Sequence, residues 1–400
     1  MAIGDLFPCE AKPRADALTG AIVERLTDDT ADTWHPYFTQ NLLSADGDRL
    51  LVASRRSGRN QLYDLRVDEG MLVQLTEGAA VGAHGAVRHP WEPLVYYVDG
   101  QVLHEVNVET CEGRVVYVVP GGFRAGILSL SGCGRYMAFA YSEALNLSTG
   151  TGRIYSSMTE HLYRRPTSVI VYIDLARDEA SAIWGEREWI SHVNVSPLDP
   201  DVVLFCHEGP WHLVQRLWVV NAHTHEVSRP IETRRLYESA GHEFFLADGR
   251  LAAQYARRES LDEPWERSLA IVEPDGSDRT DCRWPSADGP AHVQASPDGD
   301  MFVADGAQGT DVPDPAGVIS VFRCMDGQAD VQPLCRHDTS WQVQHSHPHP
   351  FFSRDGRWIY YSSDAGGRAN VYRVLAQWPL AEMAGGSSLA ESSRLGPPEP

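Results

Sequence analysis

The chain has 400 residues, of which 42% are hydrophobic, 9% aromatic and 22% charged, a composition typical of globular proteins rather than disordered or fibrous ones. Its formal net charge of −21 argues against nucleic acid and anionic membrane surfaces as partners, because both require a basic protein face. A small acidic ligand stays compatible with this charge, since Arg, His or metal charges can dominate a single cleft.

The N-terminal sequence and the cysteines bear on the cellular compartment in which the protein is expected to work. The first residues lack the basic start and apolar run of a signal peptide, and no stretch approaches the roughly 18 apolar residues of a membrane span. The 7 Cys residues are scattered without a CxxC pair, which is typical of free thiols in a reducing environment. We therefore expect a soluble cytoplasmic protein.

One sequence unit recurs along the chain. It consists of a Ser or Pro, a polar turn often containing Asp-Gly, and an alternating strand pattern. Seven units start 41 to 65 residues apart, at Leu43, Val87, Leu128, Val193, Phe244, Val293 and Phe351. This spacing predicts an all-β fold, a seven-bladed β-propeller with four-stranded antiparallel blades. A β-sandwich built from unrelated hairpins is the alternative.

The segments outside the repeated units are assigned as follows. Residues 1–34 are expected to close the ring or pack against it, and residues 1–380 to form a single propeller domain. The insert at residues 147–165 predicts a loop or short helix beside the central channel. The tail, residues 381–400, is rich in Gly, Ser, Pro and Glu and is expected to be flexible.

The first group of candidate site residues lies in the string CHEGPWHLVQRLW, which starts at Cys206. His207 and His212 are five residues apart, unlike the i, i+4 pair of a zinc-binding helix, and the Gly-Pro between them predicts a turn joining two strands. Arg216 would lie on the returning strand, where its guanidinium suits a carboxylate. An ordinary surface Arg is the alternative.

Two further histidines occupy matching places one unit apart. His242 in GHEFF and His292 in HVQASPDG each stand directly before the apolar start of a unit. The blade geometry predicts that such residues face the propeller axis, where a neutral imidazole can serve as a base. A structural, hydrogen-bonded His is an equally good interpretation of His242.

The densest cluster is WQVQHSHPHP at residues 341–350, directly before the last unit. In an extended segment His345, His347 and His349 would share one face. Imidazole suits Mn, Fe, Ni, Cu and Zn, whereas a Gln carbonyl favours a harder ion such as Mn. Blade symmetry would place this cluster beside His242 and His292 at one mouth of the channel. We therefore predict a divalent metal site, with a polar loop of solvated His as the alternative.

The chain resembles the oligogalacturonate lyases, a family of pectin-degrading seven-bladed propellers. The matching strings are HPYFTQNLLSADGDRLLVAS, CHEGPWHLVQRLW, GHEFF, HVQASPDG and RHDTSWQVQHSHPHPFFSRDGRWIYYSSD, in this order over roughly residues 35 to 375. The resemblance implies cytoplasmic cleavage of short, often unsaturated galacturonides such as digalacturonate. The expected reaction is a metal-assisted β-elimination to 5-dehydro-4-deoxy-D-glucuronate in pectin catabolism.

The resemblance also implies roles for individual residues. It implies Mn²⁺, or another divalent ion, bound by His292, Gln344, His347 and His349, with His345 set aside. It implies Arg216 and His242 as the catalytic pair. Between these two we favour His242 as the base, because a neutral imidazole is available near working pH, whereas Arg, with a pKa above about 12, stays protonated there. His207, Trp211 and His212 are expected to line the sugar subsite.

Other functions stay open at this level. The sequence contains no G-x-S-x-G, P-loop or Rossmann glycine motif, which weighs against hydrolase and nucleotide chemistry. The alternatives are a lyase for another oligouronide and a non-catalytic TolB-like propeller that binds or senses a ligand. We expect a small acidic oligosaccharide as partner, no nucleic acid or membrane, and a monomer or homodimer.

Overall fold

The computed structural model describes residues 2–148 and 156–378. Within these ranges the chain forms 31 strands, one α-helix, α1 (Ser156–Arg164), and three short 3₁₀ turns, η1 (Ala83–Gly85), η2 (Pro315–Gly317) and η3 (Gln344–Ser346). The prediction of an all-β fold is confirmed. No helix in the described ranges has the length and apolarity needed to cross a membrane.

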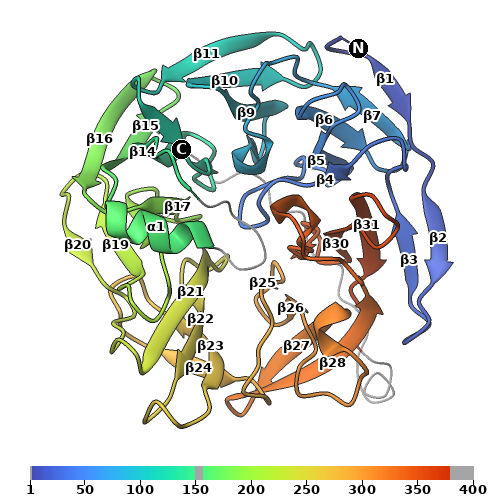
Figure 1. Ribbon diagram of the computed structural model, residues 1–400. Coiled ribbons are helices and arrows are strands. Elements are labelled where there is room, and N and C mark those ends of the chain that lie inside the picture. Colours follow the sequence, from blue (N-terminus) through green and yellow to red (C-terminus); the bar gives the residue numbers. More distant parts are fainter. Residues whose placement is uncertain (1, 149–155, 379–400) are drawn as a thin grey trace.

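The strands pair into antiparallel sheets that surround a central axis (Figure 1). The first sheet contains β1 (Leu6–Pro8) and β4–β7 (Thr33–Trp34, Arg49–Ser54, Gln61–Arg66, Met71–Gln74). The second contains β8–β11 (Val87–Arg88, Leu94–Asp99, Val102–Asn107, Gly113–Val118). The third contains β12–β16 (Phe123–Ala125, Ser129–Leu130, Tyr136–Glu143, Ser168–Asp174, Glu179–Glu186). The fourth contains β17–β20 (Ile190–Val195, Val202–His207, Leu217–Asn221, Val227–Ser228).

The remaining strands lie in two further sheets. An eight-stranded sheet contains β21–β24 (Glu238–Phe245, Leu251–Arg257, Glu266–Val272, Thr280–Arg283) and β25–β28 (Val293–Ala295, Phe302–Asp305, Val318–Met325, Gln328–Arg336). The last contains β2 (Lys12–Ala15), β3 (Ile22–Arg25), β29 (Phe351–Phe352), β30 (Trp358–Ser363) and β31 (Asn370–Leu375).

The eight-stranded sheet consists of two halves joined at a single residue pair. Strand β24 meets β28 in parallel only at Arg283 and Gln328, whereas each half pairs internally in antiparallel fashion. We interpret the halves as separate blades, so that the described strands form seven blades of four or five strands. In six of these blades a strand at the inner end coincides with, or lies beside, a unit start seen in the sequence. In the first blade, Leu43 instead forms an isolated bridge with Leu50 of β5.

The last blade combines strands from both ends of the described chain. Strand β3 pairs with β31, and β2 pairs with β3 at the outer edge. Strand β1 is added in the same way to the outer strand β7 of the first blade. Residues 6–25 thus extend two neighbouring blades. The tail predicted at residues 381–400 lies outside the described residues.

Alternating side chains of each central strand are buried against the two neighbouring blades. In β18, Val203 and Phe205 pack with Tyr172 of the preceding blade, whereas Leu204 packs with Ala240 of the following blade. Val203, Leu204 and Phe205 are all fully buried. Burial of each such side chain stabilises the fold by about 1.5–3 kcal/mol, which fixes the angle between blades and hence the position of their inner ends.

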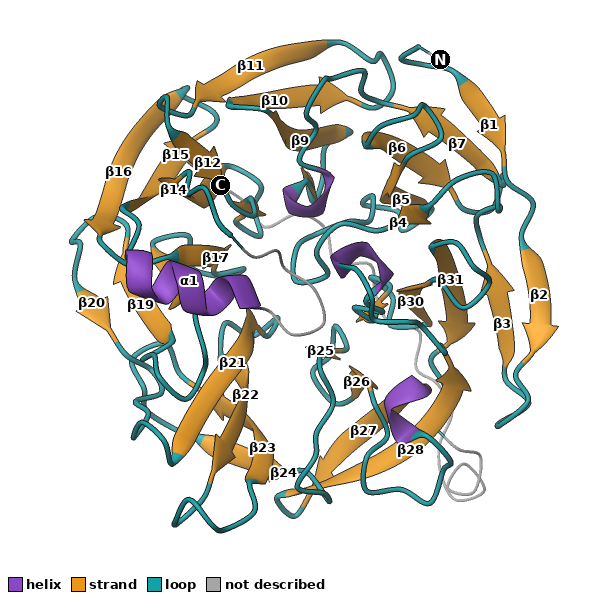
Figure 2. Cartoon of the chain, viewed as in Figure 1, coloured by secondary structure: helices purple, strands orange, loops and turns teal. Residues whose placement is uncertain are grey.

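The insert in the third blade contributes α1 to one face of the ring, beside β17 (Figure 2). His161 of this helix stacks on Trp189, with ring centroids 3.7 Å apart and an interplanar angle of 14°. The predicted short helix is therefore present, although residues 149–155 of the same insert lie outside the described ranges.

Candidate active site

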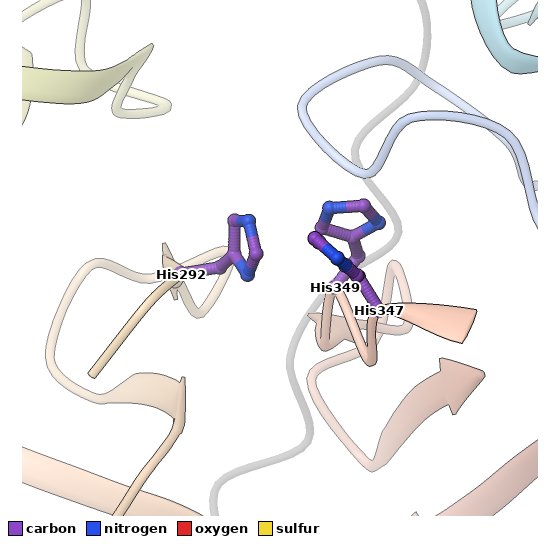
Figure 3. Close-up of side chains that lie close together, drawn as sticks. All are labelled: His292, His347 and His349. Atoms are coloured by element: carbon purple, nitrogen blue, oxygen red, sulfur yellow. The ribbon is translucent and has the colours of Figure 1, made fainter. Parts of the chain in front are cut away.

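Three histidines from two neighbouring blades converge at the inner ends of their strands. His292 directly precedes β25, and His347 and His349 lie between η3 and β29 (Figure 3). One ring nitrogen from each lies within 4.8 Å of those of the other two. The ring centroids of His292 and His349 are 4.2 Å apart. We call these residues the three-histidine cluster. The sequence predicted that His292, His347 and His349 lie together, and the structure brings them together.

The three imidazoles are held in the neutral form that binds metals. Burial lowers the pKa of His292 to about 3 and the pKa of His347 to about 4. Burial also lowers the pKa of His349 well below its ordinary value, with neighbouring His292 and His347 adding to the effect. The Nε2 atom of His349 is buried without a hydrogen-bond partner among the described residues. A divalent cation would satisfy this lone pair, so the donor set fits a metal.

Asp305, at the end of β26, fixes the orientation of His292. Its carboxylate lies 2.5 Å from His292 Nδ1 and accepts the His292 backbone N–H at 2.6 Å. Burial raises the pKa of Asp305 to about 7. A carboxylate on one ring nitrogen directs the other nitrogen of the same ring toward the cluster, an arrangement common around protein-bound metals. No pattern in the sequence pointed to Asp305.

We expect Asp305→Asn to weaken Mn²⁺ binding by about 10- to 100-fold, because His292 loses the acceptor that holds its ring. Titration calorimetry with Mn²⁺ on the folded variant measures the change. Asp330→Asn is the matched control, because Asp330 is exposed on β28 of the same blade and its side chain accepts a hydrogen bond from Gln332. Equal affinities in the two variants would refute this role of Asp305.

The segment before the cluster is not extended as the sequence predicted. Residues Gln344–Ser346 form the 3₁₀ turn η3, which rotates His345 away from the cluster. The His345 ring lies 4.7 Å from that of Trp34 instead. The expectation that His345 shares a face with His347 and His349 is therefore wrong, in agreement with setting it aside as a ligand. The role of Gln344 as a ligand stays a prediction.

His242 lies beside the cluster on an irregular part of β21. The pairing of β21 with β22 shifts register between Gly241 and Phe244, and His242 has a φ of +48°, in the left-handed region that non-glycine residues rarely adopt. Its ring centroid is 4.5 Å from that of His292. Strained residues of this kind cluster at functional sites.

The surroundings of His242 favour a neutral imidazole. Burial lowers its pKa well below the ordinary value, and the nearby His292 and Arg216 lower it further. The Nδ1 atom lies 3.3 Å from the Oε1 atom of Gln254, a residue of β22. Because an amide oxygen only accepts, this contact places the proton on Nδ1 and leaves Nε2 as the basic atom.

Arg216, directly before β19, is buried between two carboxylates. Its Nε donates to Glu243 at 2.8 Å, and its Nη1 donates to Glu208 at 2.5 Å. Burial opposes the charged guanidinium, but these carboxylates outweigh burial and hold the pKa of Arg216 well above its ordinary value. This environment disfavours Arg216 as a base and favours a role as a fixed cation. Glu208 and Glu243 were not identified from the sequence.

The buried ion pairs of Arg216 with Glu208 and Glu243 make the free energy of unfolding depend on pH in the acid range. Although burial raises the pKa values of Glu208 and Glu243, Arg216 lowers both below their ordinary values. A carboxyl with a lowered folded-state pKa stabilises the fold above its unfolded-state pKa of about 4.3, and this contribution is lost as the pH falls toward the folded-state value.

Glu243→Gln is expected to reduce the free energy of unfolding at pH 7 by about 3–5 kcal/mol, because Arg216 loses one of its partners in the interior. Below pH 5, the free energy of unfolding of the variant should also fall less steeply with decreasing pH than that of the wild-type protein, by up to about 1.4 kcal/mol per pH unit. Urea unfolding at pH 7 and pH 4 tests both effects. Glu266→Gln, which alters an exposed pair with Arg257, is the control. An unchanged pH slope would contradict the prediction.

His192 is a further residue that the sequence analysis missed. It directly precedes Val193, the start of the fourth unit, as His292 precedes Val293. Its Nδ1 atom lies 3.4 Å from Glu243, and its ring centroid is 4.9 Å from that of Tyr37. The repeated position before a unit start was the signal that could have identified it.

The three residues predicted to line a sugar subsite lie in different surroundings. The Trp211 ring contacts both catalytic candidates, at 4.7 Å from the His242 ring and 5.4 Å from the Arg216 guanidinium carbon. His207 is paired with Glu186 at 2.7 Å. His212 is exposed on the turn. The structure thus brings Trp211 to the candidate site, while the substrate-binding roles of all three stay predictions.

Comparison with known proteins gives consistent matches along nearly the whole chain. A family model described as Oligogalacturonate lyase matches residues 1–379. An oligogalacturonide lyase of Pectobacterium atrosepticum is 28% identical over 93% of this chain and 97% of the relative. An oligogalacturonate lyase of Dickeya dadantii is 29% identical over 89% of this chain and 94% of the relative.

Two solved structures share the fold. An oligogalacturonate lyase in complex with manganese has a TM-score of 0.83 and 28% identity, covering 94% of this chain and 98% of that one. The oligogalacturonate lyase of Vibrio parahaemolyticus has a TM-score of 0.82 and 25% identity, covering 94% and 99% of the two chains. Together with the match of the family model over residues 1–379, these similarities show that the chain belongs to the oligogalacturonate lyase family.

Proposed function

We propose that this protein is a lyase that cleaves short galacturonides, such as digalacturonate, by β-elimination. The observation that carries the proposal is the placement of His242, a neutral imidazole, 4.5 Å by ring centroid from His292 of the three-histidine cluster. This arrangement combines a candidate base and a candidate metal site in one place. Family membership and the manganese complex of a structural neighbour support the same conclusion.

The chemistry requires the loss of a weakly acidic proton. β-Elimination removes the hydrogen on C5, next to the uronate carboxylate, and expels the oxygen on C4. A divalent metal bound to that carboxylate would neutralise its charge and stabilise the enolate-like species that develops. We propose that the three-histidine cluster and Gln344 hold this metal, with Mn²⁺ as the favoured ion.

We propose that His242 takes the proton. Its contact with Gln254 leaves Nε2 as the basic atom, and its lowered pKa keeps this atom unprotonated at neutral pH. Arg216 is held in place by Glu208 and Glu243 and supplies a positive charge near the reacting groups. Its remaining N–H groups can bind a carboxylate or the departing oxygen. Trp211 would provide a flat surface for a pyranose ring.

The deciding experiment is incubation of the protein with digalacturonate and with its unsaturated form, with and without Mn²⁺. We expect a new ultraviolet absorbance from the C4–C5 double bond, or the rearranged product by mass, only when Mn²⁺ is present. Chelator treatment should remove activity and lower the melting temperature, and Mn²⁺ should restore both. Turnover of other oligouronides but not galacturonides would assign the chain to a different substrate.

A non-catalytic TolB-like role is the second candidate that the sequence left open. A scaffold gives no reason to gather three neutral imidazoles and a strained His at one point of the ring. If the stability of the protein is indifferent to Mn²⁺ and to chelator, the non-catalytic role gains support. The cytoplasmic location, the single domain over residues 1–380 and the monomeric or homodimeric state stay predictions.

A further inference from the structure

His192 occupies a place in the fourth blade that matches the place of His242 in the fifth. It lies in the register shift between Ile190 and Val193, where β17 pairs with β18. His242 lies in the corresponding shift where β21 pairs with β22. Both β17 and β21 are inner strands that face the central axis of the ring (Figure 2). The irregular strand that places the proposed base is thus repeated one blade earlier, again with an imidazole.

His192 completes a buried group of charges. The single guanidinium of Arg216 faces the two carboxylates of Glu208 and Glu243. His192 Nδ1 lies 3.4 Å from Glu243 Oε1, so a proton on this imidazole would bring the sum of the four charges to zero. Although burial raises the pKa values of both carboxyls, Arg216 and then His192 lower them. Buried charges are costly unless they are balanced, so this network is a suitable place for a protonated imidazole.

The network uses only one edge of the His192 ring. Because Nδ1 faces Glu243, the second nitrogen, Nε2, lies on the other side of the ring and forms no hydrogen bond within the described residues. The His192 side chain is 15% exposed, whereas that of Glu243 is fully buried. The ring packs on Tyr37, which also lies 5.2 Å by ring centroid from His349 of the three-histidine cluster. An accessible imidazole edge therefore lies one side chain away from the proposed metal site.

The proposed β-elimination needs a proton donor as well as a base, because an unprotonated sugar oxygen is a poor leaving group. The groups around His192 are unsuited to this task. The pKa of Arg216 is held well above its ordinary value by its two carboxylates, which outweigh burial. Burial raises the pKa of Tyr37 well above its ordinary value. The thiol of Cys206 lies within 4.8 Å of the His192 ring, and burial raises its pKa to about 12.

We propose that His192 is the general acid of the elimination, and that its Nε2 gives a proton to the departing oxygen. His242 takes the proton from C5, and the electron pair of that C–H bond forms the C4–C5 double bond. The electron pair of the broken C4–O bond stays on the oxygen, which receives the proton of His192. One proton is thus gained by His242 and one lost by His192, and exchange with water restores both. The inference rests on the proposed function, because it assigns the second proton transfer of the same reaction.

The test compares two substrates on the manganese-loaded wild-type protein and on His192→Asn. The amide of Asn can place an N–H group where Nδ1 stands, so the variant keeps a donor toward Glu243 but has no acid. The substrates are digalacturonate and a galacturonate with a para-nitrophenyl ether on O4, whose oxygen departs as a stable anion without a proton. The variant should cleave digalacturonate about 10²- to 10⁴-fold more slowly than the wild-type protein, and the aryl ether at nearly the wild-type rate. Ultraviolet and visible absorbance follow both reactions.

His223→Asn is the matched control, because His223 is an exposed histidine of the same blade that is also paired with a carboxylate, that of Asp201 at 3.1 Å. Both of its rates should stay at the wild-type values. Equal losses on the two substrates in His192→Asn would overturn the inference, because a disturbed Arg216 network slows both reactions. Full activity of His192→Asn on digalacturonate would overturn it as well.

A second measurement decides the case in which the wild-type protein cleaves digalacturonate but not the aryl ether. Imidazole added to His192→Ala should raise the rate on digalacturonate in proportion to the concentration of its protonated form. Absence of this rescue, or a rescue that follows neutral imidazole, would overturn the inference. A wild-type protein that cleaves neither substrate would instead overturn the proposed function, so the two failures are distinguishable.

Discussion

His242→Ala is expected to lower the rate of digalacturonate cleavage by about 10²- to 10⁴-fold, the usual contribution of a general base. The His242 ring contacts His292 and Trp211, but it is not one of the three rings whose nitrogens converge. The variant should therefore keep about one Mn²⁺ per chain. Continuous ultraviolet absorbance measures the rate, and elemental analysis of the dialysed protein measures the metal.

His223→Ala provides the control for this variant. His223 is exposed in the turn after β19, and its Nε2 atom lies 3.1 Å from Asp201 Oδ1, so its removal should leave both rate and metal content unchanged. Full activity of His242→Ala would refute the assignment of the base. Loss of Mn²⁺ together with activity would instead identify His242 as a support of the metal site.

His349→Ala should lose both bound metal and activity. His349 supplies one of three converging nitrogen donors, and its buried Nε2 has no other partner among the described residues. Removing one ligand from a small donor set leaves an open, weakly binding site. For a protein that binds Mn²⁺, a concentration of about 100 times Kd stabilises the fold by about 2.7 kcal/mol and raises the melting temperature. The melting temperature of His349→Ala should therefore no longer rise when Mn²⁺ is added.

His345→Ala is a closely matched control for the metal variant. It alters a histidine four residues away in the same loop, whose ring packs on Trp34 instead of facing the cluster. We expect His345→Ala to keep its metal and its activity. A His349→Ala protein that still binds stoichiometric Mn²⁺ with wild-type affinity would exclude this residue as a ligand.

The repeated pattern in the sequence was enough to predict the blades and the three-histidine cluster. A recognisable turn marks each unit, and His292, His347 and His349 lie one, four and two residues before the unit start that follows them. Because blades are related by approximate symmetry, residues just before successive unit starts become neighbours at the channel. The same rule applied to Val193 would have identified His192.

The local supports of the site could not be predicted in this way. Glu208 and Glu243 follow His207 and His242 in the chain. Glu208 meets Arg216 across the β18–β19 connection of the fourth blade, whereas Glu243 reaches Arg216 only through the packing of the fourth blade against the fifth. The pairing of Asp305 with His292 similarly depends on how β25 and β26 are aligned. In the turn η3, His345 packs on Trp34, a contact that no periodic pattern in the sequence contains.

The blade shared by the two chain ends has a consequence for the order of events during synthesis. His347 and His349 immediately precede β29, and the blade of β29 is completed at its outer edge by β2 and β3. His347 and His349 are therefore synthesised after the strands of the first six blades, including the neighbours that they need. Until then His292 stands without the other two members of the three-histidine cluster, so we expect the proposed metal site to form only when the last blade has joined the ring.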